Sequence, residues 1–378
     1  MRILFACGGT TGHVNPAIGV AGRIKELIPD AQILFIGANG RMEMDLVPRE
    51  GYEIRGIPVS SLSRSLSKEG VAHNLQAMKE MREGSRQSRE ILREFRPDVV
   101  VGTGGYVCYP VLKEAAHLGI PTAVHESNAE PGLTTKLLEH SVDVIMVGFE
   151  EARKNYRQPG KVRVTGTPVR LGFMRSDRAA ARKALGLTMD EPVVLSVWGS
   201  LGATDMNLTV ARMIGLAMRD RPFRMLHSAG KRGIADMTGY MEKELGLSGW
   251  NEAGLEVRDY IFDMPLWMES ADLVLCRSGA STLAELAAVG KPALLVPSPN
   301  VVHNHQEKNA RVLEHAGAAR VLSENGITAE SIYENILDML SDRDRLKQMA
   351  DSMRGMAVEN ATDEITSIVL SLAARDED

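Results

Sequence analysis

The stretch Cys7-Gly8-Gly9-Thr10-Thr11-Gly12-His13 joins an apolar run, residues 2–6, to a segment in which apolar residues recur at helical spacing. Such a run is typical of a buried parallel strand, so the stretch predicts a strand, a glycine loop and a helix N-terminus. Three glycines let the loop turn tightly and approach a ligand closely. The N–H groups at the start of the helix favour an anion such as a phosphate, and His13 adds an imidazole suited to proton transfer.

Two other interpretations of this loop have to be weighed. A dinucleotide-binding loop would need the pattern G-x-G-x-x-G, which fails because Cys7 stands in place of the first glycine. A tight strand-to-helix turn that binds no ligand remains open from this stretch alone.

The length of 378 residues exceeds what one ordinary core supports and predicts two domains. A hydrophobic content of 44% and a charged content of 25% are those of a soluble globular protein. The net charge of −5 argues against a general nucleic-acid binder, so no nucleic-acid partner is expected. No apolar run approaches the roughly 20 residues that span a bilayer. The chain starts with a strand pattern instead of a signal peptide, so we expect it not to be secreted.

The three cysteines, Cys7, Cys108 and Cys276, lie far apart and form no C-x-x-C pair. This pattern is typical of small buried thiols in a reducing compartment, so we expect a cytoplasmic protein. No cysteine or carboxylate cluster accompanies the histidines, and neither a metal nor another cofactor is expected.

Short apolar runs alternate with helical patterns through the first half of the chain. The runs cover residues 3–7, 33–36, 99–101, 122–124, 144–147 and 162–164. Alternation of this kind predicts an α/β fold in which helices wind doubly around a parallel sheet. Polar or glycine-rich stretches, residues 102–106 and 125–128, follow two of the runs. Because ligands collect at the carboxyl ends of parallel strands, these stretches and the first loop are expected to share one crevice.

The pattern breaks near residues 165–170, and a second series of apolar runs begins at residue 192. Its later runs cover residues 223–227, 255–261, 273–275, 293–296 and 319–322. We therefore predict two doubly wound domains, residues 1–166 and 167–357. The amphipathic C-terminal helix, about residues 358–378, could pack back on the first domain.

The second half has glycine loops of its own, at residues 199–203 and 276–285. The latter places small residues and hydroxyls at a helix start, with Glu285 about one turn further on. This arrangement can hold a diphosphate and let a carboxylate accept hydrogen bonds from two sugar hydroxyls. A helix N-cap formed by Ser278 or Ser281, with Glu285 in solvent, is the alternative. Because no P-loop motif is present, we expect backbone N–H groups and arginine to meet a diphosphate, without an obligatory metal.

A basic stripe follows one face of a long predicted helix. It consists of Lys79, Arg82, Arg86, Arg89, Arg93 and Arg96, spaced by three and four residues. Next to apolar residues such as Val71 and Leu75, the stripe can lie on anionic lipid or meet a lipid diphosphate. Five glutamates between residues 69 and 94 dilute its charge, so a solvated face is the alternative.

Several motifs taken together carry a family resemblance that runs essentially from end to end. The motifs are Gly8 to His13, Arg41-Met42-Glu43, Gly104-Gly105-Tyr106-Val107, His125-Glu126-Ser127-Asn128, Gly166-Thr167-Pro168-Val169-Arg170, Cys276 to Glu285 and Gln306-Glu307-Lys308-Asn309. With them, the chain resembles the bacterial peptidoglycan GlcNAc-transferases, the MurG family of GT-B glycosyltransferases (glycosyltransferase family 28). The resemblance implies two Rossmann-like domains that face a cleft.

The resemblance also implies an activity and its partners. Members of this family transfer GlcNAc from UDP-GlcNAc, with inversion, to the 4-hydroxyl of MurNAc in lipid I. The product is lipid II, which serves peptidoglycan synthesis and thereby cell shape and division. The expected location is the cytoplasmic side of the cell membrane, as a peripheral protein on an anionic lipid surface.

Individual roles follow from the same resemblance. In the C-terminal domain, Ile261 would meet uracil, Glu285 the ribose and Gln306 the GlcNAc hydroxyls. The diphosphate would be surrounded by Ser200, Arg170 and Thr282. The sugar and the acceptor would contact Thr10, Thr11, Gly12 and Asn128. His13 is the candidate base for the acceptor hydroxyl, and Glu126 is a second catalytic candidate.

Two positions depart from the family pattern, and two other activities compete. Thr11 and Leu201 stand where the family has glycine and glutamine. A β-branched residue such as Thr11 is costly if its backbone needs a positive φ. A UDP-GlcNAc epimerase of the same architecture would also bind the donor, but would need no acceptor. A non-catalytic nucleotide-sugar sensor would need only the second domain.

Overall fold

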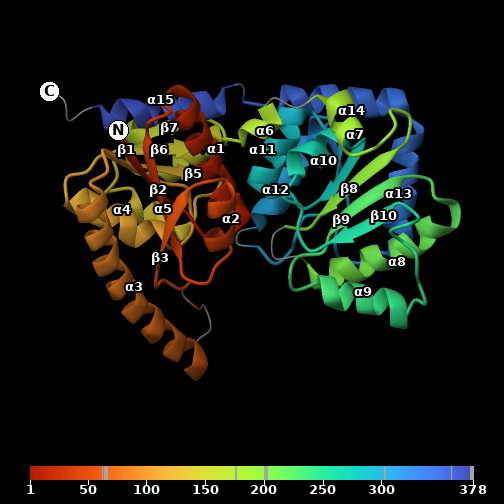
Figure 1. Ribbon diagram of the computed structural model, residues 1–378, viewed down its shortest axis with the longest axis horizontal. Helices are drawn as coiled ribbons and strands as arrows, with labels where there is room; N and C mark the ends of the chain where they lie inside the picture. Colours follow the sequence, from red (N-terminus) through yellow and green to blue (C-terminus); the bar gives the residue numbers. More distant parts are fainter. Residues whose placement is uncertain are drawn as a thin grey trace. The chain divides into compact units, whose positions relative to one another are not determined.

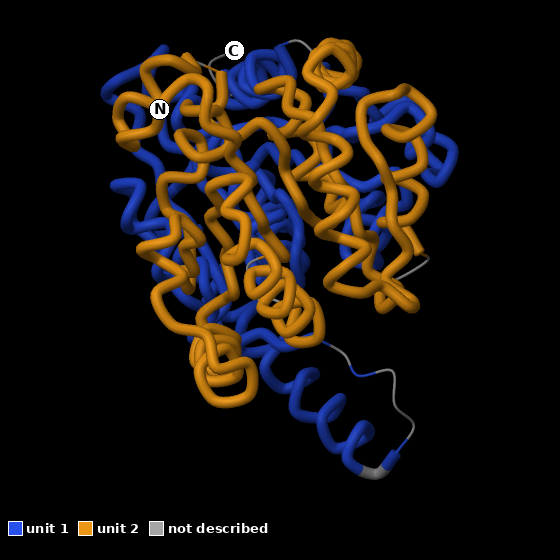
Figure 2. The backbone as a smooth tube through the Cα atoms, turned by 90° about the vertical axis from the view of Figure 1, so that its right-hand side faces the viewer, with its two compact units in different colours: residues 1–171, 358–378 blue, residues 172–357 orange. Residues whose placement is uncertain are grey.

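The computed structural model describes residues 1–61, 63, 67–174, 177–199, 203–301, 304–358 and 360–374. The chain forms two compact units, coloured differently in Figure 2. Unit 1 comprises residues 1–171 and 358–378, and unit 2 comprises residues 172–357.

Unit 1 is built on a seven-stranded parallel sheet with the strand order β3-β2-β1-β4-β5-β6-β7 (Figure 1). The strands are β1 (Arg2–Ala6), β2 (Gln32–Ala38), β3 (Glu53–Ile57), β4 (Val99–Gly102), β5 (Thr122–Glu126), β6 (Val144–Val147) and β7 (Val162–Val164). The helices are α1 (Thr11–Leu27), α2 (Glu43–Arg49), α3 (Lys68–Phe95), α4 (Cys108–His117), α5 (Leu133–Leu138), the 3-10 turns Glu150–Asn155 and Pro159–Lys161, and α15 (Ala361–Ala373).

The sheet of unit 1 is buried on both faces, which explains its continuous apolar strands. Successive side chains of β1 alternate between the faces. Ile3 and Phe5 join the core that contains α1 and α15. Leu4 and Ala6 join the opposite core, which contains residues of α3 and α4.

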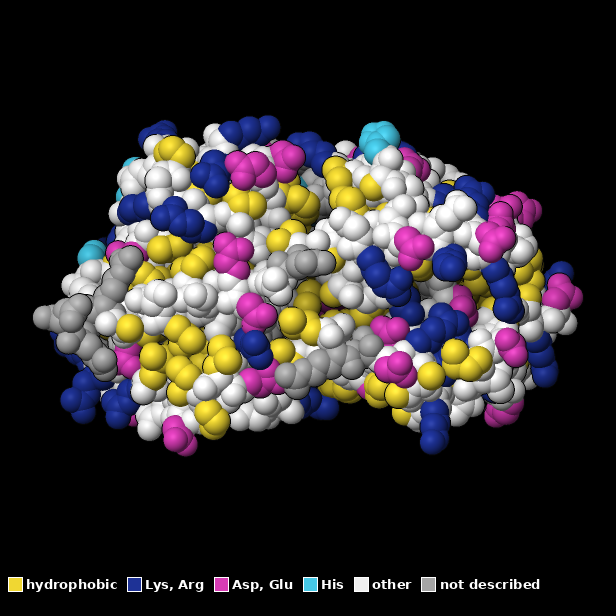
Figure 3. Space-filling model, turned by 90° about the horizontal axis from the view of Figure 1, so that it is seen from above, with side chains coloured by type: hydrophobic (Ala, Val, Ile, Leu, Met, Phe, Trp, Pro, Cys, Tyr) yellow, Lys and Arg dark blue, Asp and Glu magenta, His cyan; other side chains and the backbone are white. Residues whose placement is uncertain are grey.

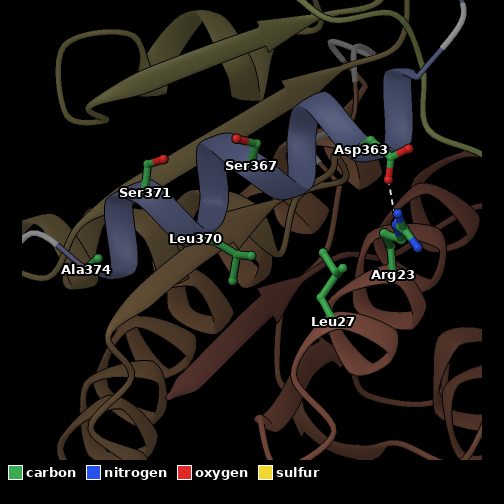
Figure 4. Close-up of a pocket in the computed structure, with 7 residues that line it drawn as sticks. All are labelled: Arg23, Leu27, Asp363, Ser367, Leu370, Ser371 and Ala374. Atoms are coloured by element: carbon green, nitrogen blue, oxygen red, sulfur yellow. Dashed lines mark hydrogen bonds and ion pairs between the residues drawn. The ribbon is translucent and has the colours of Figure 1, made fainter.

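The C-terminal helix α15 belongs to unit 1 because it packs along α1. Figure 4 shows Arg23 of α1 facing Asp363, with Nε and Oδ1 at 2.5 Å. Leu27 and Leu370 approach each other from the two helices, in a groove of about 550 Å³. The start of the helix is fixed to the chain before the domain boundary, since the backbone N–H of Val169 donates to Oγ1 of Thr362 at 3.2 Å.

This contact explains where the boundary falls. The units divide after Leu171, a few residues beyond the predicted position. Arg170 was expected in the second domain, and it belongs to unit 1 instead. A short helix, α6 (Leu171–Met174), lies at the boundary.

Unit 2 contains a six-stranded parallel sheet with the order β10-β9-β8-β11-β12-β13. The strands are β8 (Val193–Val197), β9 (Arg224–Ser228), β10 (Leu255–Arg258), β11 (Leu273–Cys276), β12 (Ala293–Leu295) and β13 (Ala319–Val321). The helices are α7 (Arg178–Ala184), α8 (Thr204–Asp220), α9 (Ile234–Lys243), α10 (Met264–Ser270), α11 (Ala280–Val289), α12 (His305–His315), α13 (Ala329–Ser341) and α14 (Arg343–Gly355).

Each sheet has a point at which the strand order reverses. In unit 1, β1 lies between β2 and β4, and in unit 2, β8 lies between β9 and β11. Open α/β sheets bind ligands at the carboxyl ends of the strands beside such a point. A ligand is therefore expected at the loops after β1 and β4 in unit 1 and after β8 and β11 in unit 2.

The helices and the surface are the parts of the protein that bear on contact with a membrane. Among the helices that the structure describes, none is long and apolar enough to cross a membrane. The face seen in Figure 3 carries basic and acidic side chains intermixed with apolar ones.

Candidate functional site

The loop after β1 is shaped by its glycines and by the start of α1. Gly9 has φ +88°, in the left-handed region that favours glycine. Thr10 is the N-cap of α1, and its side chain is exposed. Thr11 is the first residue of the helix and has no positive φ, so the substitution at this position is compatible with the fold. Thr11 and Gly12 are half-buried at the helix start.

His13 is held by the loops after β1 and β4. Its Nδ1 lies 2.9 Å from the carbonyl oxygen of Gly8, and its own carbonyl accepts a hydrogen bond from Oγ1 of Thr103 at 2.6 Å. A carbonyl oxygen only accepts, so Nδ1 must carry the proton of this bond. In the neutral ring, Nε2 is then the free proton acceptor.

Glu126, at the end of β5, is the centre of a different arrangement. One carboxylate oxygen accepts from the backbone N–H and the side-chain amide of Asn128, at 3.1 and 3.0 Å. The other accepts from the N–H of Gly132 and Oγ1 of Thr135, both at 2.9 Å. Four donors occupy this buried carboxylate, which favours positioning of Asn128 over proton transfer.

A motif residue, His125, and the candidate Arg170 are held by contacts within unit 1. Nε2 of His125 is 2.9 Å from the carbonyl oxygen of Gly166, and burial lowers the pKa of the imidazole. The guanidinium of Arg170 lies 3.4 Å from Oε1 of Glu50.

In unit 2, the loops after β8 and β11 approach each other. The guanidinium of Arg277 lies over the ring of Trp198, 5.2 Å from its centroid. Arg277 also pairs with Glu324 at 2.5 Å. Ser200 and Leu201, which follow on the β8 loop, lie outside the described residues.

The loop after β11 leads directly into α11. Its N-cap is Gly279, without a side-chain hydrogen bond, and Glu285 is only 6% exposed. The alternative of a serine cap with a solvated Glu285 is therefore wrong. Oγ of Ser278 donates to the carbonyl of Gln306 at 2.8 Å, which ties this loop to α12.

Other residues that were expected to contact the nucleotide sugar also lie in unit 2. Oε1 of Gln306 accepts from the backbone N–H of Ser298 at 2.9 Å. Thr282 is half-buried on the first turn of α11, and Ile261 is buried just after β10. The structure thus brings Gln306 together with the Ser278 loop.

The structure reveals two buried groups to which the sequence assigned no role. Glu43 was noted only as part of a motif, and an acidic residue at a helix start usually indicates a favourable dipole contact. His227 lies inside an apolar run and gives no signal in the sequence. Its Nδ1 is 2.9 Å from Oγ of Ser196, which also accepts from Nε1 of Trp198 at 3.0 Å.

The cysteines do not form a reactive centre. Burial raises the pKa of the thiols of Cys108 and Cys276 to about 12, so neither is a thiolate near neutral pH. Among the described residues, no cluster of His, Cys, Asp and Glu is arranged to hold a metal ion.

Comparison with known proteins identifies the family. The glycosyltransferase family 28 N-terminal domain matches residues 3–147, and the family's C-terminal domain matches residues 193–365. The chain belongs to glycosyltransferase family 28. Its two parallel α/β units have the GT-B fold of this family.

Relatives in family 28 match nearly the whole chain. A protein of Acetivibrio thermocellus is 42% identical over 369 residues, which are 98% of this chain and 97% of the relative. A protein of Caldanaerobacter subterraneus subsp. tengcongensis is 40% identical over 372 residues, 98% of this chain and 100% of the relative. Both are named UDP-N-acetylglucosamine--N-acetylmuramyl-(pentapeptide) pyrophosphoryl-undecaprenol N-acetylglucosamine transferase.

Solved structures agree on the fold of family 28. MurG of Acinetobacter baumannii superposes with a TM-score of 0.66 at 27% identity, over 98% of this chain and 99% of that one. A UDP-GlcNAc 2-epimerase of Neisseria meningitidis, solved with UDP-GlcNAc, also reaches 0.66, but at 15% identity over 98% and 100% of the two chains. The latter likeness shows a shared fold alone.

Proposed function

We propose that the protein is an inverting N-acetylglucosaminyltransferase that moves GlcNAc from UDP-GlcNAc to the 4-hydroxyl of MurNAc in lipid I. The product is lipid II, the precursor for peptidoglycan synthesis. The observation that carries the proposal is 42% identity, over 98% of the chain, with a relative named for this transfer.

Unit 2 holds the donor in this proposal. The buried carboxylate of Glu285 accepts hydrogen bonds from the ribose hydroxyls, and the backbone of Ile261 meets uracil. Gln306 contacts the GlcNAc hydroxyls. Thr282, at the start of α11, meets the diphosphate, whose negative charge is favoured at a helix N-terminus. Ser200 is assigned to the same diphosphate.

Residues of unit 1 meet the acceptor and the transferred sugar. His13 is the base, because its Nδ1 is engaged with Gly8 and its Nε2 is left to accept a proton. Thr10, Thr11, Gly12 and Asn128 contact the sugar and the acceptor. Glu126 positions Asn128. Arg170 stabilises the negative charge that develops on the leaving UDP.

The proposal is tested by the dependence of UDP release on the acceptor. Purified protein is given UDP-GlcNAc with and without a lipid I analogue, and both UDP and the disaccharide are measured. Release only with the analogue, together with disaccharide, is the expected result. Release of sugar products from UDP-GlcNAc alone would indicate an epimerase, and binding without turnover would indicate a sensor.

A lipid-linked acceptor requires contact with a membrane, and α3 offers a surface for it. Val71, Leu75 and Met78 are exposed along the first part of α3, at helical spacing. Within the basic stripe, Arg86 is paired with Glu83 and Glu90, and Arg89 with Glu114.

Two of the remaining basic residues lie next to the apolar positions. Lys79 and Arg82 are exposed one turn further along α3. We assign this apolar and basic half of α3 to the anionic cytoplasmic face of the membrane, where the protein is peripheral.

A further inference from the structure

We propose that Glu43 is a positioning residue for His13 and acts on it through the peptide bond between Gly8 and Gly9. This inference rests on the proposed function, in which His13 is the base. It assigns a role to a buried carboxylate that the transfer chemistry has so far left unused.

Glu43 is the first residue of α2 and is fully buried beneath the loop after β1. Its Oε2 accepts from the backbone N–H of Gly9 at 3.1 Å, and its Oε1 accepts from the N–H of Ala38 at 3.0 Å. The side chain fits because two neighbours have none: a β-carbon on Gly8 would overlap Oε1, and one on Gly37 would overlap Cγ. The fold therefore leaves space for a carboxylate at this point.

The bond to Gly9 reaches His13 through a single amide. The N–H of Gly9 and the carbonyl of Gly8 belong to the same peptide group. The N–H donates to Glu43, and the carbonyl accepts from Nδ1 of His13 at 2.9 Å. Carboxylate, peptide and imidazole thus form one chain of hydrogen bonds, in which each bond polarises the next.

These linked hydrogen bonds stabilise His13 while it acts as the base during transfer. Nε2 of His13 takes the proton of the acceptor hydroxyl as that oxygen bonds to C1 of GlcNAc. The bond from C1 to the diphosphate breaks, and its electron pair leaves with UDP. The ring then carries a positive charge, which strengthens the bond from Nδ1–H to Gly8 and is stabilised by the carboxylate beyond it. In the Ser-His-Asp triad a carboxylate orients its histidine directly, whereas here one amide lies between them.

The variant Glu43→Gln keeps the size of the side chain and removes its charge. Loss of a group that orients a metal-binding histidine typically costs about 10- to 100-fold in activity, and we expect a similar fall in kcat for a group that orients a catalytic histidine. The KM for UDP-GlcNAc should change less than twofold, because the contacts to uracil and ribose, which are far from Glu43 in the chain, are assigned to unit 2. Glu139→Gln is the matched control, since Glu139 is another buried carboxylate of unit 1 that accepts a backbone N–H, from Gln158 at 2.7 Å. A kcat of E43Q as high as that of E139Q would overturn the proposal.

A double-mutant cycle separates this role from general damage to the loop. If Glu43 acts through His13, E43Q should lower kcat no further when it is combined with His13→Ala. An additional tenfold loss in the double variant would overturn the inference and leave His13 as the base. Unchanged turnover in H13A alone would instead refute the assignment of His13, and with it the inference.

The tautomer of His13 provides a readout that does not depend on turnover. Nitrogen-15 NMR of histidine-labelled protein should report Nδ1–H in the wild type and a larger share of Nε2–H in E43Q. Should E43Q not fold, Glu43→Asp serves, because it retracts the carboxylate from Gly9 by one methylene. An unchanged Nδ1–H population in the variant that folds would overturn the proposal.

Discussion

Gly104 lies directly against the ring of His13, so that a β-carbon on Gly104 would overlap Cδ2 of the imidazole. Gly104 also has φ +117°, a backbone conformation that side chains disfavour. The loops after β1 and β4 therefore fix each other at the point where the sheet order reverses. The orientation of His13 depends on both.

The variant Gly104→Ala should consequently lose transferase activity while its affinity for the nucleotide of the donor is retained. We expect at least a tenfold lower kcat, because an error of about 1 Å in a reacting group can cost on the order of 100-fold. The affinity for UDP, measured by calorimetry, should stay within twofold. Gly160→Ala is the control, since no atom lies within 4 Å of its added β-carbon. Equal kcat in the two variants would contradict the prediction.

Glu126→Gln should lower the stability of unit 1, because the carboxylate of Glu126 accepts four hydrogen bonds. A glutamine accepts at only one oxygen, so at least one buried donor loses its partner, which costs about 1–3 kcal/mol. Urea unfolding of unit 1 should show this loss. A large fall in kcat with unchanged stability would instead support Glu126 as a catalytic residue.

The two parallel sheets and the positions of two of their loops were predictable from the sequence. Apolar runs and helical spacing predicted two parallel sheets, because buried strands and amphipathic helices differ in period. The loops after β1 and β11 were found from their glycines and hydroxyls, since tight turns at strand ends need such residues.

The partners of long polar side chains were not predictable in the same way. Arg86 finds Glu83 and Glu90 on its own helix, a spacing that the sequence contains. Arg89 instead finds Glu114 on α4, a contact that only packing decides. Glu43, which follows β2, contacts Gly9 after the neighbouring strand β1 for the same reason. The spacing of residues along a helix decides which side chains share one of its faces. Tertiary packing decides which partner each polar side chain contacts.

Glu285→Ala should weaken donor binding because the buried carboxylate is assigned to the ribose. A hydrogen bond to a charged group is worth about 1.5–3 kcal/mol, which corresponds to roughly 10- to 100-fold in affinity. The comparison ligand is 2′-deoxy-UDP, which lacks one of the two ribose hydroxyls. The wild type should prefer UDP over the deoxy ligand, and E285A should bind both alike. Retained discrimination in E285A would refute the ribose assignment.

Charge reversal on α3 should reduce binding to vesicles that contain anionic lipid. Each basic residue near such a surface contributes about 1 kcal/mol, so Lys79→Glu with Arg82→Glu should lower partitioning by about tenfold or more. The effect should shrink in high salt. Lys347→Glu with Arg343→Glu, on exposed positions of α14, changes the net charge equally and is the control. Equal losses in both double variants would mean that only net charge matters.

Replacing the side chain of His227 should alter how the stability of unit 2 depends on pH. His227 is fully buried, and burial lowers its pKa to about 3. In the unfolded chain, histidine titrates near its ordinary value of about 6.5. Between these values the unfolded state binds more protons, so the free energy of unfolding falls as the pH falls from about 6.5 toward 3. The contribution is complete above about pH 6.5, and its slope is at most about 1.4 kcal/mol per pH unit.

The variant His227→Gln can still form hydrogen bonds near Ser196 but cannot titrate, so its stability should depend less on pH between 6.5 and 4.5. All three tryptophans, Trp198, Trp250 and Trp267, lie in unit 2, so their fluorescence follows the unfolding of this unit by urea. His125→Gln, in unit 1, is the control and should leave the tryptophan transition unchanged. A wild-type slope that persists in H227Q would mean that other groups of unit 2 carry its acid sensitivity, because only the titration of His227 has been removed.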